Sequence, residues 1–343
     1  MTSIKNGKTI LFVFALLSFG TICFSQNLIV KGDTLFARKE YKEALFILNK
    51  AIIKYPDSSR AYFYKASSEL ELHMYDTAIS DFNKSIELHL KTKDLTGAYY
   101  SIGMIKSIEH DYTGGIYYYN QAIGISPNEW LFYYAKANNE LDIGDNKNAL
   151  EDINIAAKLN TDSAADIYNL RGLIKFYTQD TLGALKDFST AIRKDSNNPT
   201  PYYGRVNLKI ALKEYRGALM DINKVLKIDT STIILDYRGN IKEKMKDTVG
   251  AMDDYNKLLT YNPTFARGYF DRGCLEEALK KYPSAISDFT KAMENYPEYI
   301  PYYIHRGTCY EITGRKEDGC NDYHKALDMG DVKASDLIVK YCR

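Results

Sequence analysis

The chain has 343 residues, with 45 lysines and arginines against 44 aspartates and glutamates, and its formal net charge is +1. This balance leaves no basic surface of the kind that attracts nucleic acid, so nucleic acid is not an expected partner. The length alone would suggest two or three domains, but a continuous internal period, described below, overrides that expectation.

The N-terminal residues have the order of a secretory signal peptide. Lys5 and Lys8 precede the apolar run "ILFVFALLSFGTIC", which leads into the exit sequence "CFSQ". The run is too short for a comfortable membrane span, so residues 1–25 are expected to be cleaved. A lipid anchor at Cys23 is the alternative, and it is disfavoured because Ile22 occupies a position that normally needs a small side chain. We therefore expect an exported protein, periplasmic or secreted, with no stable membrane span after cleavage.

The rest of the chain repeats one amphipathic phrase. "AISDFTKAM" at 285–293 echoes "AISDFNKSI" at 78–86, and both contain a small residue followed four positions later by a large apolar one. The small residues of successive copies are 34, 37, 34, 35, 34, 33, 34 and 34 positions apart. The nine in-phase pairs are Ala44/Leu48, Ala78/Phe82, Gly115/Tyr119, Ala149/Ile153, Ala184/Phe188, Ala218/Ile222, Ala251/Tyr255, Ala285/Phe289 and Gly319/Tyr323.

Each copy predicts two helices that pack closely. Twelve residues before each small residue stands another residue that is small in eight of the nine copies, the exception being Val206. Small and large apolar residues at this spacing form one helical face, and turn signals such as "GDNKNAL" separate the two faces. A helix–turn–helix of about 34 residues cannot bury such a face alone, so it must stack on its neighbours.

This pattern resembles the tetratricopeptide repeat. The resemblance includes small residues at repeat positions 8, 20 and 27, a bulky residue at position 24, and proline at position 32 in some copies, such as Pro263 and Pro297. It implies an all-α, right-handed α-solenoid over residues 26–330, with about 19 helices in all. The nine expected repeats span approximately 25–58, 59–92, 96–129, 130–163, 165–198, 199–231, 232–265, 266–299 and 300–330. The apolar stripe in residues 331–343 predicts a helix that caps the last repeat.

The resemblance also implies a function in binding. In the family, the first helices line a concave groove that binds segments of other proteins. Aromatic rings at position 5 and primary amides at position 9 suit an extended peptide, because an amide can both donate to and accept from a backbone. The candidate residues are Phe63, Tyr100, Tyr134, Tyr203 and Phe270 at position 5, and Asn138, Asn207 and Asn240 at position 9.

Two binding functions follow from this groove. We expect a protein–protein interaction scaffold, as a subunit or assembly factor of a cell-envelope complex. A glycan- or peptidoglycan-associated binding protein is the alternative, because the groove is rich in tyrosine. The oligomeric state is left open by the sequence.

A base and an acid recur 16 residues apart and predict structural ion pairs. Seven repeats carry Lys or Arg at position 7 and Asp at position 23, and the third repeat lacks both. This joint presence and loss indicates that each base meets its acid across the helix pair, and Arg should bind the carboxylate through two hydrogen bonds. The five Arg pairs are Arg171–Asp187, Arg205–Asp221, Arg238–Asp254, Arg272–Asp288 and Arg306–Asp322.

The cysteines predict one disulfide and no metal site. Cys320 lies in the second helix of the last repeat, and Cys342 ends the capping helix expected to pack on it, so we predict a bond between them. Cys274 and Cys309 are expected to be free thiols. No cysteine or histidine spacing fits a zinc site.

An enzyme is not expected. The sequence has no glycine-rich phosphate loop, no Gly-x-Ser-x-Gly and no His-Glu-x-x-His. A solenoid without an appended domain also lacks an obvious dry pocket for catalysis. No cofactor is predicted.

Overall fold

The computed structural model describes residues 28–160 and 165–342, and all the regular structure in them is helical. Residues 28–37 form a helix, and helices α2 to α19 follow it. The predicted all-α class and the number of about 19 helices are therefore confirmed. The predicted signal peptide, residues 1–25, and the lipidation alternative at Cys23 lie outside the described residues. The chain divides into two compact units, residues 1–180 and 181–343.

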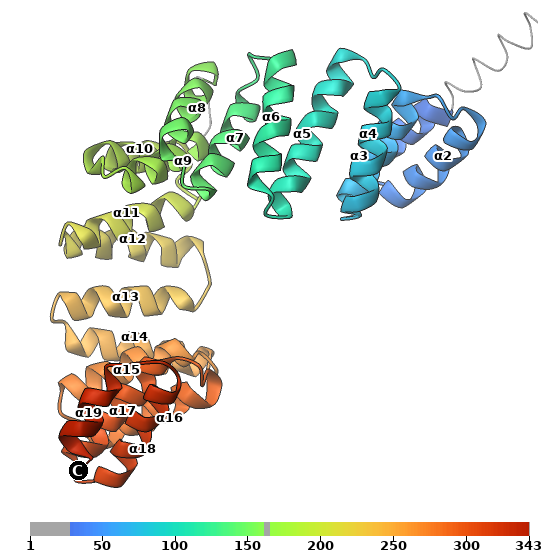
Figure 1. Cartoon of the computed structure of the whole chain (residues 1–343). Coiled ribbons are helices and arrows are strands. Elements are labelled where there is room, and N and C mark those ends of the chain that lie inside the picture. Colours follow the sequence, from blue (N-terminus) through green and yellow to red (C-terminus); the bar gives the residue numbers. More distant parts are fainter. Residues whose placement is uncertain (1–27, 161–164, 343) are drawn as a thin grey trace, which may run out of the picture. The chain divides into compact units, whose positions relative to one another are not determined.

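In the first unit, each helix packs on the one before it, and first helices of successive repeats also touch: α3 with α5, α5 with α7, and α7 with α9. The pairs can be followed in Figure 1. The helices are α2 (Tyr41–Lys54), α3 (Ser59–Glu71), α4 (Tyr75–Glu87), α5 (Thr92–Ile108), α6 (Tyr112–Ile125), α7 (Trp130–Asp142), α8 (Asn146–Leu159) and α9 (Ala165–Tyr177).

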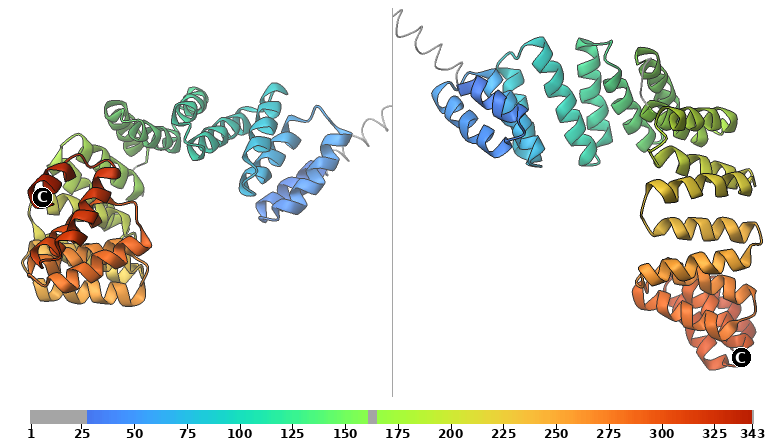
Figure 2. Two further views of the ribbon diagram at one scale, coloured as in Figure 1. Left: turned by 60° about the horizontal axis from the view of Figure 1, so that its bottom comes forward. Right: turned by 180° about the vertical axis from the view of Figure 1, so that it is seen from behind.

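The second unit has the same organisation, and first helices of successive repeats touch here as well: α13 with α15, and α15 with α17. Figure 2 shows the antiparallel pairs of this unit, yellow to red, from two further directions. Its helices are α10 (Thr181–Lys194), α11 (Thr200–Ala211), α12 (Tyr215–Ile228), α13 (Ile233–Lys244), α14 (Thr248–Tyr261), α15 (Ala266–Ala278), α16 (Tyr282–Asn295), α17 (Ile300–Ile312), α18 (Lys316–Asp328) and α19 (Ala334–Tyr341).

The small residue of each first helix makes room for the large residue of its partner helix. A Cβ atom added to Gly239 would lie 2.6 Å from the ring of Tyr255, which is completely buried. The bulkier Val206 faces the smaller Ile222 in the equivalent place, and both are buried. The two positions thus share one volume, as expected for a close-packed core.

The turn inside each helix pair has one conformation throughout. The second residue after the first helix has a positive φ in all nine pairs, and glycine supplies it in two of them. In the eighth pair, Lys281 N–H bonds to Glu276 O and Lys280 N–H to Glu277 O, which is the pattern of a Schellman cap. The nine residues are Lys39, His73, His110, Gly144, Gln179, Lys213, Lys246, Lys280 and Gly314.

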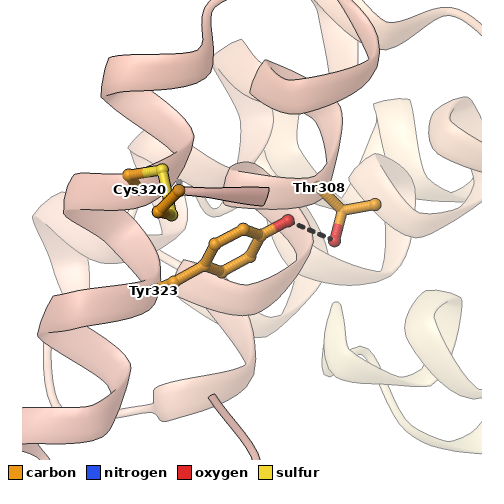
Figure 3. The surroundings of a disulfide bond; sticks show 4 residues. Thr308, Cys320 and Tyr323 are labelled. Carbon is orange, nitrogen blue, oxygen red and sulfur yellow. Dashed lines mark hydrogen bonds between the residues drawn. A yellow bond between two sulfur atoms is a disulfide. The ribbon is translucent and has the colours of Figure 1, made fainter. Parts of the chain in front are cut away.

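The last helix covers the end of the second unit. Ala334 of α19 is completely buried against α18, whereas Ser335 and Asp336 are exposed. Cys320 on α18 and Cys342 after α19 form a disulfide with a Cα–Cα distance of 5.6 Å. Figure 3 shows this bond beside Tyr323, whose hydroxyl donates to Thr308 Oγ1 at 3.4 Å. The covalent bond therefore fixes the helix that shields the apolar face of α18.

Reduction of this bond is expected to lower the free energy of unfolding by about 3 kcal/mol, because the bond restricts the unfolded chain. Its two cysteines are 22 residues apart in the sequence. Denaturant unfolding with and without reductant measures the effect. A variant with both Cys320→Ala and Cys342→Ala should not respond to reductant. Peptide mapping of the purified protein without reductant that finds both thiols free would contradict the pairing.

Candidate functional site

The structure places four of the predicted arginine pairs in direct contact. In each, the guanidinium Nε donates to one carboxylate oxygen and Nη2 to the other. The Nε–Oδ2 distances are 2.8 Å for Arg205–Asp221, 2.8 Å for Arg238–Asp254, 2.6 Å for Arg272–Asp288 and 2.9 Å for Arg306–Asp322. These are the two-point contacts that lysine cannot make.

The other base–acid pairs are one predicted arginine pair and two lysine pairs. Arg171 belongs to the first unit and Asp187 to the second, so this pair stays a prediction. In the first unit, Lys65 contacts Asp81, and Lys136 Nζ lies 2.8 Å from Asp152 Oδ2. The base and acid at positions 7 and 23 therefore meet in lysine repeats as well.

A third charged residue, at position 11, joins five of these six clusters, whereas the ninth repeat has Tyr310 at this position. In two repeats it is lysine: Lys242 Nζ lies 2.7 Å from Asp254 Oδ2 and also donates to the Gly250 carbonyl. In three repeats it is a glutamate with one buried oxygen that has no hydrogen-bond partner, namely Glu69, Glu140 and Glu276. Burial and the nearby aspartate raise the pKa of Glu140 to about 8 and that of Glu276 to about 7. These clusters are structural, because they join the two helices of one repeat.

The predicted groove aromatics of the first unit pack largely against their neighbours. The ring of Phe63 lies 5.9 Å from that of Phe82, and the ring of Tyr100 lies 5.5 Å from that of Phe132. Tyr134 packs on Trp130 at 6.1 Å. Each ring is half-buried, so only part of it is available to a ligand.

In the second unit, the predicted residues divide into exposed and internally bonded ones. Asn207 is exposed, as is Asn138 in the first unit. Tyr203 packs on Tyr237 with ring centroids 5.7 Å apart. Asn240 is half-buried and donates to the Asp236 carbonyl at 3.0 Å and to Asp271 Oδ2 at 3.1 Å. Binding by these residues stays a prediction.

A pocket of about 500 Å³ lies on this part of the second unit, and Phe270 is on its wall. The residues that line it come from α15 and the loop before it, from the end of α16 and its following loop, and from α17. They are Thr264, Phe265, Ala266, Arg267, Phe270, Asp271, Asn295, Tyr296, Tyr299 and Tyr302. Five of these ten are aromatic and four others are polar or charged, and aromatic walls with some polar groups are typical of a ligand pocket.

Sequence reasoning missed the charged residues at this pocket. Asp236 occupies position 5 of the seventh repeat, where five other repeats have an aromatic ring, and it is 4% exposed. Arg267 Nε lies 3.5 Å from Asp236 Oδ2 and 3.4 Å from Asp271 Oδ2, so two carboxylates share one guanidinium. Burial is the main cause, and the charge of Asp271 the second, that raises the pKa of Asp236 to about 7. An acid at position 5, where the other repeats carry aromatic, isoleucine or asparagine side chains, is the signal that could have found this cluster.

Further chemistry is not indicated in the described part of the chain. It contains no group of three or more His, Cys, Asp and Glu side chains arranged to hold a metal ion. Burial raises the pKa values of the free thiols of Cys274 and Cys309, which disfavours their reactive thiolate form. Among the described helices, none is long and apolar enough to cross a bilayer.

Comparisons with known proteins agree on one family. A tetratricopeptide repeat family model matches residues 134–199. Human tetratricopeptide repeat protein 6 is 35% identical over 106 residues, which are 31% of this chain and 19% of that protein. Hsp70-Hsp90 organizing protein 2 of Arabidopsis thaliana is 24% identical over 247 residues, which are 68% of this chain and 41% of that protein. The chain thus spans less than half the length of either curated relative.

A solved structure is similar in fold over most of the chain. A tetratricopeptide repeat protein from Parabacteroides merdae has a TM-score of 0.56 at 19% identity, and the match covers 72% of this chain and 99% of that one. This similarity shows the fold of stacked helix pairs.

Proposed function

Because the chain is a tetratricopeptide repeat protein, we propose that it is an interaction scaffold that holds an extended segment of another protein against its first helices. The observation that carries the proposal is the aromatic pocket between α15 and α17, next to the amide of Asn240 on α13. Rings provide apolar contact area, and amides provide hydrogen bonds to a peptide backbone. Catalysis is not part of the proposal.

The location of the protein is part of the same proposal. The signal-like order of residues 1–25 supports export, and a scaffold in the periplasm or outside the cell would serve an envelope complex. A glycan-binding role is the second candidate, because Tyr296 and Tyr299 at the pocket expose 51% and 43% of their surface and could stack on sugar rings. A glycan array probed with the purified protein separates the two candidates.

Replacing Asn138, Asn207 and Asn240 together by alanine is expected to weaken binding of the partner about tenfold or more, since up to three amide hydrogen bonds are lost. Crosslinking pull-down from the periplasm identifies the partner, and titration of the purified pair measures the affinity. The same change at Asn49 and Asn321, which are exposed on the second helices α2 and α18, provides the control. A folded triple variant that retains every partner at wild-type affinity would exclude the proposed binding by these amides.

A further inference from the structure

Two acidic side chains but one basic side chain make up the charged cluster at the pocket on α15. Asp271 lines it with 15% of its side chain exposed, and Asp236 lies behind at 5%. Arg267, the basic residue among the described residues on the pocket wall, is 69% exposed and approaches both carboxylates only at 3.4–3.5 Å. One solvated guanidinium therefore serves two largely buried carboxylates.

The hydrogen bonds of these carboxylates are incomplete. Asp271 Oδ2 accepts from Asn240 at 3.1 Å and from Arg267 Nε at 3.4 Å, whereas Asp236 Oδ1 is buried without a partner in the described structure. A buried carboxylate oxygen without a donor is costly, because burial removes the water that would otherwise satisfy it. Arg267 therefore does not supply all the hydrogen bonds that the two carboxylates can accept, so a further cationic donor would be favourable here.

The walls of the pocket favour the same kind of group. Phe270, Tyr299 and Tyr302 form a continuous aromatic surface with ring centroids 4.8–5.8 Å apart. The face of an aromatic ring attracts an ammonium or guanidinium group and also packs on its aliphatic stem. Tyr299 is 43% exposed and thus remains accessible from solvent.

We infer that this pocket binds a lysine or arginine side chain of the segment that occupies the groove. The cationic head of this side chain bonds to Asp271, and its charge also compensates the buried carboxylate of Asp236. Its aliphatic stem lies on the rings of Phe270 and Tyr299. Arg267 competes for the same carboxylates, so it turns toward solvent when the ligand enters. This inference rests on the proposed peptide-binding function and adds the chemistry of the side chain that is recognised.

The experiment uses the mature chain and short acetylated, amidated peptides with randomised flanks. Their central residue is fixed in turn as lysine, arginine, norleucine, citrulline or glutamate. Lysine and arginine peptides should be enriched about tenfold over their neutral counterparts, norleucine and citrulline. Equal retention of the charged and neutral peptides would overturn the inference.

Two variants with opposite expected effects on peptide binding test whether the pocket is responsible for the preference. Asp271→Asn should abolish the preference for a basic residue, whereas Arg267→Gln should strengthen binding of the enriched peptide about threefold to tenfold by removing the internal competitor. Each variant has a control that makes the same change of net charge at an exposed residue outside the pocket. Asp253→Asn on α14 is the control for Asp271→Asn, and Arg216→Gln on α12 is the control for Arg267→Gln. An Arg267→Gln variant with unchanged or weaker binding, or a control with the same effect as its matched variant, overturns the assignment.

The outcome also separates this inference from the proposed function. If peptides with a neutral or acidic central residue are enriched, the groove still binds peptides. Only the inferred recognition of a basic side chain is then overturned. Retention of no peptide by folded protein overturns both.

Discussion

Asp254→Ala is expected to lower the free energy of unfolding by about 3 to 5 kcal/mol, the usual cost of removing one partner from a buried charge cluster. Asp254 is completely buried and accepts from Arg238 Nε at 2.8 Å and from Lys242 Nζ at 2.7 Å. Only 21% and 16% of these two basic side chains are exposed. The variant therefore leaves two cations facing each other with little access to water.

The neighbouring residue provides a matched control on the same helix. Asp253 pairs with Lys257 at 2.7 Å, but its side chain is 56% exposed, so Asp253→Ala should destabilise the protein far less than Asp254→Ala. Denaturant unfolding followed by circular dichroism measures both variants. If their losses were equal, the buried cluster would not hold the helix pair together.

Removal of the other partner should cost less than removal of Asp254. In Arg238→Met, the carboxylate keeps Lys242 as a partner, so no charge is left uncompensated. A double-mutant cycle on Arg272 and Asp288 tests the same coupling in another repeat and should give an interaction free energy of more than about 1 kcal/mol. A cycle with no coupling would mean that the two side chains act independently.

The sequence is sufficient to predict these contacts because its nine repeat copies can be compared with one another. Position 7 and position 23 change together across the copies, and such joint change indicates spatial contact. The same reasoning did not reveal that position 11 joins the cluster. Glu276 and Lys242 carry opposite charges at equivalent positions, so no constant pattern links position 11 to the aspartate. A contact that can be made by a residue of either charge cannot be predicted from the spacing of charged residues alone.

The candidate binding site was less predictable than the fold. A ring at position 5 can face a ligand or pack on the next repeat, and its identity is the same in both cases. Tyr100 shows the difference, because its ring lies against Phe132 of the following repeat at 5.5 Å. Asp236 at position 5 resembled a solvated surface charge, and its burial depends on Asp271 and Arg267, which come 31 or more residues later.

Asp236→Asn is expected to raise the free energy of unfolding by about 2 to 4 kcal/mol near pH 8 and to leave it nearly unchanged near pH 4. Burial and Asp271 raise the pKa of Asp236 from 3.8 to about 7. The stability that this raised pKa provides is complete below the unfolded value and is lost as the pH rises through about 7. Asparagine has nearly the same shape and carries no charge, so the variant avoids this loss.

The charged groups around Asp236 fix the direction of this effect. Asp271 and Arg267 face it from α15, and Glu243 lies on its own helix, α13. The two acids disfavour ionisation of Asp236, and Arg267 at 3.5 Å offsets them only in part. The difference between variant and wild type should therefore grow steadily between about pH 4 and pH 8, because other titrations cancel in the comparison.

The control for this pH dependence is Asp253→Asn, at an exposed carboxylate whose pKa is lowered by its hydrogen bond to Lys257. That carboxylate is ionised in both folded and unfolded protein above about pH 5, so the stability difference for this variant should be flat from there to pH 8. A flat difference for Asp236→Asn as well would mean that Asp236 is ionised at neutral pH in the folded protein. In that case Arg267 alone would satisfy both carboxylates, and the pocket would have no need of a further cation.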